Sequence, residues 1–168
     1  MIPNIHEIEL ALSRYFNISK HICMPASTIF FNHEIDFLAI RKSGYAIEVE
    51  IKRSVSDMKA ESRKDHNHES NKIKELYFAF PDKIFDKCVP LVPEHAGILK
   101  IYFWGYWRVS LERKPKPNPN ARKLTESEIN KVNRYSNYRI WSCKNTIVNL
   151  TNQVKHLKND KHKKKRKD

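Results

Sequence analysis

The residues best suited to chemistry lie in the segment AIEVEIK, residues 46 to 52. A strand period of two sends its three central apolar side chains to one face and Glu48, Glu50 and Lys52 to the other. Asp36 precedes them in a second strand-like segment. Two carboxylates on neighbouring strands can hold a hard divalent cation, and an ammonium group beside them can orient water against a phosphate. The spacing favours a metal-dependent nuclease, although a solvated strand face with alternating charges has the same pattern.

The flanking sequence predicts the elements that position these residues. Apolar residues at helical spacing predict a helix over residues 5 to 16, and polar residues from 54 onward predict a second helix of uncertain end. A near-continuous apolar run at 76 to 80, halted by Pro81, predicts a central strand buried on both faces. The other predicted elements are strands at 28–31, 35–41 and 45–52, a short helix at 84–89, and an edge hairpin of 97–103 with 106–111.

The C-terminal third differs in composition. Three prolines between residues 114 and 120 exclude regular structure. Thr125 and Glu128 have the spacing of a capping box, and an apolar stripe at steps of three or four follows. We therefore expect a core domain at 1–112, a Pro-rich connector at 113–124, a helix at 125–154 that packs on the core or on a partner subunit, and a disordered basic tail at 155–168.

The net charge and the cysteine content limit the classes of protein to which this chain can belong. The 168-residue chain has a formal charge of +13, and its last 14 residues hold eight Lys and Arg against two Asp. Such a charge favours a polyanionic partner. The three cysteines lie far apart without disulfide or zinc-ligand spacing, so we expect them to be reduced. The sequence has no signal-peptide pattern and no membrane span, which predicts a soluble cytoplasmic protein.

The order of these motifs resembles the PD-(D/E)XK nuclease superfamily, and within it the MmcB-like family of DNA-repair endonucleases. The likeness rests on VEIK at 49–52, Ser54 with Asp57-Met58, LYFAFP at 76–81 and VPEHAGI at 92–98. It implies an α/β fold with a restriction-endonuclease-like core: a mixed central sheet flanked by helices, here followed by a long C-terminal helix. It also implies hydrolysis of phosphodiester bonds with Mg²⁺ or Mn²⁺.

The resemblance assigns a role to individual residues. Asp36 and Glu50 match the metal-binding carboxylates, Lys52 matches the catalytic lysine, and the Ile51 carbonyl is implied as a further metal ligand. Glu7 matches the glutamate that some members carry on their first helix. Glu48 departs from the family pattern, which has an apolar residue there, and it either extends the metal site or pairs with a lysine.

Two further groups are candidates for nucleic-acid contact. Polar and basic residues just after the charged strand can hold phosphate oxygens or remain solvated; they are Ser54, Lys59, Arg63 and Lys64. Aromatic residues of the predicted hairpin can stack on bases, although most should belong to the core. Trp104 and Tyr106, at the turn, are the expected exceptions.

The leading hypothesis is a Mg²⁺- or Mn²⁺-dependent DNA endonuclease that acts in repair, recombination or processing, with RNA not excluded as substrate. The alternative is a non-catalytic nucleic-acid-binding protein that retains the fold. The apolar stripe of the C-terminal helix also suggests a homodimer, although a lone domain could bury that stripe on itself.

Overall fold

The structure is a computed structural model that describes residues 2–29, 34–61 and 70–164. It divides into two units, residues 1–126 and 127–168. The first unit holds all six strands, and the second is the long helix α4, Glu126–Lys164. Within the described residues no helix is both long enough and apolar enough to cross a membrane.

The first unit is built on a six-stranded mixed sheet in the order β1-β2-β3-β4-β5-β6. The strands are β1 Ile22–Ser27, β2 Ile35–Ile40, β3 Ala46–Ile51, β4 Ile73–Pro81, β5 Gly97–Trp104 and β6 Tyr106–Arg113. β3 runs parallel to β4, and β4 to β5, whereas the other three pairs are antiparallel. The α/β fold with a mixed sheet flanked by helices is confirmed.

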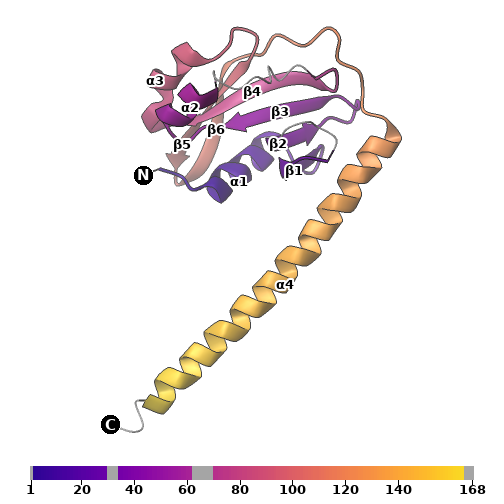
Figure 1. The fold of residues 1–168 in the computed structure, drawn as a ribbon. Coiled ribbons are helices and arrows are strands. Elements are labelled where there is room, and N and C mark those ends of the chain that lie inside the picture. The colour runs from indigo at the N-terminus through magenta and orange to yellow at the C-terminus, as the bar shows by residue number, and fades with distance from the viewer. Residues whose placement is uncertain (1, 30–33, 62–69, 165–168) are drawn as a thin grey trace. The chain divides into compact units, whose positions relative to one another are not determined.

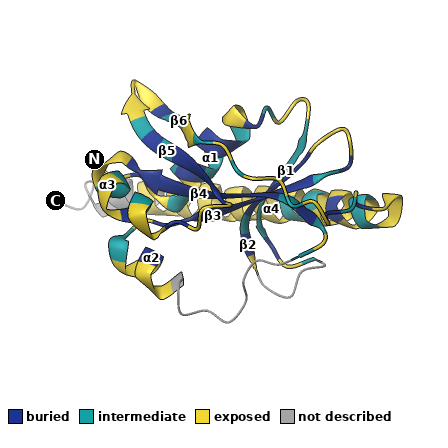
Figure 2. Ribbon diagram, turned by 90° about the horizontal axis from the view of Figure 1, so that it is seen from above, coloured by how far each residue is buried: buried dark blue, intermediate teal, exposed yellow. Residues whose placement is uncertain are grey.

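Helices cover the two faces of the sheet differently (Figure 1). On one face lies α1, Ile5–Tyr15, whose Ile8 and Leu12 pack in a cluster with Val49 and Tyr77. On the other face lie α2, Val55–Glu61, and α3, Phe85–Cys88, with short 3₁₀ turns at Asp82–Ile84 and Val89–Leu91. Met58 and Cys88 pack there against Phe78. The central strands are therefore buried on both sides (Figure 2).

Most predicted elements are present, and the first strand is the main error. Residues 28 and 29 are not in a strand, and residues 30 and 31 lie outside the described residues. β1 instead covers Ile22–Ser27 and pairs with β2 at the sheet edge. It includes Pro25, which an edge strand tolerates because it has no second neighbour to receive a hydrogen bond.

The C-terminal helix is longer than expected. α4 continues through Lys164, so the basic tail predicted as disordered from residue 155 is helical at least to that point. No Gly or Pro interrupts this part of the chain. Lysine is a good helix former, and positive charge near a helix C-terminus is favoured by the helix dipole. Residues 114–125 contain no helix or strand, as expected from their prolines.

Candidate functional site

The alternation of β3 is as predicted. Ile47, Val49 and Ile51 join the apolar cluster beneath α1. Glu48 and Glu50 pair with Leu76 and Phe78 of β4 and so point to the opposite face, under α2 and α3. Lys52 follows on the same side. We call Glu48, Glu50 and Lys52 the charged row.

Asp36 is brought to the charged row by the antiparallel pairing of β2 with β3. Phe37 pairs with Val49, which places Asp36 opposite Glu50 one step further along. One carboxylate oxygen, Oδ2, accepts a hydrogen bond of 2.8 Å from the backbone N–H of Ile51. Asp36 is half-buried, whereas Glu50 and Lys52 are buried. Asp36 is therefore the most accessible carboxylate of the site.

Glu50 and Lys52 form a buried ion pair. The Lys52 ammonium donates to Glu50 Oε2 across 2.7 Å, and each side chain is only 4% exposed. The ammonium also lies 6.0 Å from the centre of the Phe78 ring. In such a low-dielectric setting each charge depends on its partner, because neither can be solvated by bulk water.

The surroundings raise the pKa of the Glu50 carboxyl. Burial is the largest cause, since it penalises the charged form, and the negative charges of Asp36 and Glu48 act in the same direction. The Lys52 ammonium opposes them by attraction and by its hydrogen bond. Because the pKa is raised overall, Glu50 holds its proton to higher pH than an ordinary glutamate. A cation placed beside Glu50 would favour its carboxylate form.

Glu48 is part of the charged row and is fully buried. It pairs with Leu38 on one side and Leu76 on the other, so its strand neighbours are apolar. Its charge raises the pKa of Glu50, so the two carboxylates are electrostatically coupled. The sequence offered two roles for Glu48, as a metal ligand or as a lysine partner. The structure adds that it belongs to the same buried electrostatic unit as Glu50.

The donor set suits a hard divalent cation in kind, because carboxylate oxygens are the ligands that Mg²⁺ prefers. Within the described residues, however, no three His, Cys, Asp or Glu side chains gather tightly enough to form a metal site. Lys52 instead supplies positive charge to Glu50. Asp36 and Glu50 therefore fit a cation by chemistry, and the Lys52 ammonium already bonds to one of the two Glu50 carboxylate oxygens.

Two other residues were predicted to belong to the site, Glu7 and Ile51. Glu7 does not join the carboxylates: α1 covers the opposite face, and Glu7 forms a capping box with Asn4, with bonds of 2.7 and 3.0 Å. A glutamate at the third helical position is well placed to cap, and this local use explains its presence. Ile51 lies at the site through its backbone N–H, and the role of its carbonyl stays a prediction.

The predicted phosphate-contacting residues are only partly described. Ser54 caps α2 by accepting a hydrogen bond of 3.0 Å from the backbone of Asp57. Lys59 is exposed in the last turn of that helix. Arg63 and Lys64 lie outside the described residues, so their predicted role is untested.

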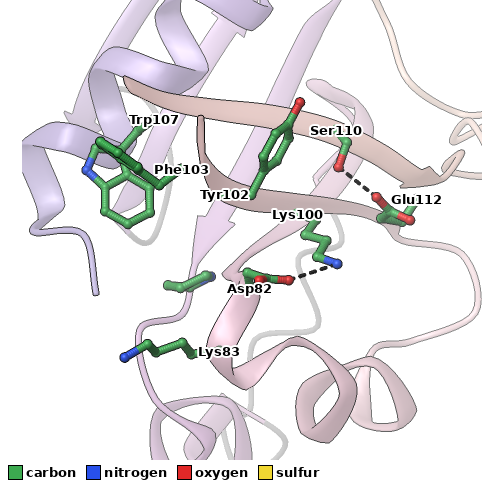
Figure 3. Close-up of a pocket in the computed structure, with 9 residues that line it drawn as sticks. Asp82, Lys83, Lys100, Tyr102, Phe103, Trp107, Ser110 and Glu112 are labelled. Atoms are coloured by element: carbon green, nitrogen blue, oxygen red, sulfur yellow. Dashed lines mark hydrogen bonds and ion pairs between the residues drawn. The ribbon is translucent and has the colours of Figure 1, made fainter. Parts of the chain in front are cut away.

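A concave feature lies apart from the charged row, at the carboxyl ends of β4 and β5 (Figure 3). It is a hollow of about 580 Å³ whose lining includes Asp82, Lys83, Lys100, Tyr102, Phe103 and Trp107. Lys100 pairs with Phe80, which follows Phe78 on the face of the charged row, and its ammonium contacts Asp82 at 2.8 Å. Two strand spacings, about 10 Å, separate the Lys52 and Lys100 positions. Sequence analysis missed Asp82 and Lys83, although residues just beyond a buried strand commonly line sites.

The tip of the β5–β6 hairpin is aromatic and exposed (Figure 2). Trp104 is 71% and Tyr106 49% exposed, as predicted, whereas Trp107 belongs to the core. Gly105 has a φ of +72°, a conformation that suits glycine and permits the tight turn. The guanidinium of Arg108 lies 4.5 Å from the centre of the Tyr106 ring. The tip therefore combines flat apolar surface with positive charge.

Comparison with known proteins supports the fold and leaves the function open. No protein-family model and no curated protein matches the chain. A solved structure of SPO1766, a protein of unknown function from Silicibacter pomeroyi, is similar, with a TM-score of 0.61. The two sequences are 14% identical, and the likeness covers 80% of this chain and 86% of that one. At this identity the similarity establishes a shared fold.

The buried pair makes a stability prediction. Lys52→Met should lower the free energy of unfolding by about 3–5 kcal/mol, because it leaves the Glu50 carboxyl buried without its ammonium partner. Glu50→Leu combined with Lys52→Met should instead be neutral or stabilising by up to about 4 kcal/mol, since apolar side chains replace the pair and neither charge then has to be desolvated. Urea unfolding of the wild type, both single variants and the double variant at pH 7 measures these differences.

The raised pKa of Glu50 adds a pH dependence to this comparison. As pH rises above 4.5, the ordinary value, the unfolded chain loses the Glu50 proton before the folded chain does. The wild type therefore loses stability from this group, and the advantage of the double variant should grow. If the double variant has a lower free energy of unfolding than either single variant, the ion pair does not destabilise the folded protein, which would contradict the prediction.

Proposed function

We propose that this protein is a divalent-metal-dependent endonuclease that hydrolyses DNA phosphodiester bonds. The observation that carries the proposal is the convergence of Asp36, Glu50 and Lys52 on one face of the sheet, with the Lys52 ammonium 2.7 Å from Glu50. These are the three residues that match the PD-(D/E)XK motif. A buried glutamate with a raised pKa, beside a lysine, is also typical of functional sites in general.

The proposed roles follow from the chemistry of each group. Asp36 and Glu50 would hold Mg²⁺ or Mn²⁺, with the Ile51 carbonyl as a further oxygen ligand. The ion would supply Lewis acidity and lower the pKa of a bound water. Lys52 would orient the attacking water and offset negative charge that develops on the phosphate. The apolar cover formed by Met58 and Phe78 strengthens these interactions by keeping bulk water away.

Substrate approach is proposed from the side of Asp36 and the hairpin. Glu50 and Lys52 are sealed, whereas Asp36 is half-buried. The hollow that contains Lys83 and Lys100 lies on the same sheet, near the carboxyl ends of the parallel strands. The net charge of +13 would attract the phosphate backbone and make binding sensitive to salt.

The alternative is a nucleic-acid-binding protein that has the fold without the reaction. It is favoured by one observation: Lys52 already neutralises Glu50 in a closed pair. This alternative requires salt-sensitive binding with no divalent-dependent cleavage of any nucleic acid, so one assay separates the two functions.

The cleavage prediction is tested with labelled duplex, nicked, branched and single-stranded DNA, and matching RNA, in Mg²⁺, Mn²⁺ or EDTA. Cleavage is expected with either metal and not with EDTA. Glu50→Gln or Lys52→Met should lower the rate by at least about 10²-fold, because each removes a group that stabilises the reacting phosphate or its water. DNA affinity should change little.

Glu75→Gln is the matched control. Glu75 is also a buried glutamate with a cationic partner, Arg41 at 2.7 Å, but it lies with Tyr77 on the opposite face of the sheet. Its loss should leave the cleavage rate unchanged in folded protein. Wild-type protein that binds DNA but cuts no substrate with either metal would support the non-catalytic alternative, and equal activity of Glu50→Gln would exclude the proposed site.

A separate prediction concerns the aromatic tip. If the substrate presents unpaired bases, Trp104→Leu should weaken binding of a labelled single strand by about 5- to 150-fold, since one stacked base contributes about 1–3 kcal/mol. Trp104→Phe should retain most of the affinity, because it keeps an aromatic face. Fluorescence anisotropy measures both variants. Equal loss in the two variants would indicate that stacking at this position is not the cause.

A further inference from the structure

An apolar stripe runs along α4 with no counterpart in its own unit. Up to residue 164, the last that the structure describes, the unit consists of the single 39-residue helix α4, and this described part offers no second element to cover the stripe. The side chains concerned are between 49% and 63% exposed, with Cys143 also exposed; they are Ile140, Cys143, Ile147, Leu150, Val154 and Leu157. Six such positions in register on one helix call for a partner surface.

The spacing of the stripe specifies the kind of partner. The successive steps are three, four, three, four and three residues, which is a heptad repeat of period 3.5. The first positions of the repeat hold the β-branched residues Ile140, Ile147 and Val154. The fourth positions hold Cys143, Leu150 and Leu157. β-Branched residues at the first position with leucine at the fourth favour two parallel strands over three or four.

We propose that α4 pairs with α4 of a second copy of this chain as a parallel two-stranded coiled coil over residues 140–157. This interface does not depend on the proposed nuclease function. It would join two copies of the first unit, and so two copies of the charged row, in one particle.

The flanking residues permit two basic chains to approach. The flanks of the seam at Thr146, Thr151 and Gln153 are uncharged. Both threonine hydroxyls bond to carbonyls of their own helix, at 3.1 and 2.7 Å, so their hydrogen-bonding needs are met without the partner. Like-charge repulsion is therefore absent from the middle of the seam.

One flanking pair opposes dimerisation. In parallel register, Arg139 of one chain faces Lys144 of the other. The Lys144 ammonium lies 5.1 Å from the ring centre of Trp141, to the side of the seam, which limits the repulsion without removing it. Added salt screens the remaining charge, so the dimer should become tighter as ionic strength rises.

The surface area that two copies of α4 can bury against each other sets the expected affinity of the dimer. Covering the exposed half of six side chains on each of two helices removes on the order of 1,000 Å² from water, which is at the lower end of specific interfaces. We therefore expect a dissociation constant in the micromolar range rather than an obligate dimer.

Sedimentation velocity of the full chain between about 1 and 200 μM tests the dimer. Wild-type protein should shift from monomer to dimer, and Ile147→Glu should remain monomeric because it places a charge in the seam. Val148→Glu is the matched control: the adjacent side chain is similarly exposed, at 56%, but lies outside the seam. Circular dichroism verifies that both variants are folded. A wild-type monomer throughout, a trimer, or equal dissociation by the two variants would overturn the proposal.

Cys143 reports strand direction. In parallel register the two Cys143 side chains face each other, so mild oxidation with copper phenanthroline should yield a disulfide-linked dimer that Cys143→Ser abolishes. Cys88 is buried and should not substitute for it. A dimer in which Cys143 does not crosslink would overturn the parallel arrangement.

Discussion

The structure depends on the burial of three ionisable side chains: Glu48 and Glu50 lie within the central strand β3, and Lys52 comes directly after it. β3 is hydrogen-bonded on both edges and covered on both faces, so Glu48, Glu50 and Lys52 cannot reach bulk water through the sheet. The Glu50–Lys52 pair lowers the cost of this burial but does not remove it, as the raised pKa of Glu50 indicates. A sheet selected for stability alone would place apolar residues here. The proposed metal site would account for this cost, because functional groups are where folds accept such costs.

The two faces of the sheet differ in the side chains that they bury. Beneath α1, aliphatic and aromatic side chains form the larger apolar cluster, and the polar pair on that face, Arg41 with Glu75, lies partly toward solvent. Beneath α2 and α3 the cluster is smaller and shares its face with the charged row. The face beneath α1 therefore supplies hydrophobic stabilisation without the cost of the charged row, which falls on the other face.

Sequence patterns predict the elements in which one face or both faces are strongly apolar. The alternation in β3, the uniform burial of β4 and the exposed aromatic turn were predictable because period and composition act locally. β1 was not, since Pro25 argues against a strand unless the strand lies at an edge, which is a property of the whole sheet. Glu7 was assigned by resemblance, but its capping bonds to Asn4 are a purely local use of the same residue. The burial of Glu50 and Lys52 depends on how α2 and α3 pack over them, and no local sequence pattern predicts that packing.

The ion pair also constrains the proposed reaction. Because Lys52 already occupies Glu50 Oε2, a cation and the ammonium compete for the same carboxylate. A phosphate near Lys52 would offer the ammonium an alternative acceptor, and both oxygens of Glu50 would then be available to the ion. Binding of metal and of substrate would in that case favour each other, since each lowers the cost of the other's rearrangement. The raised pKa of Glu50 acts in the same direction, because a carboxyl that is poorly stabilised by its own protein gains most from a new positive charge.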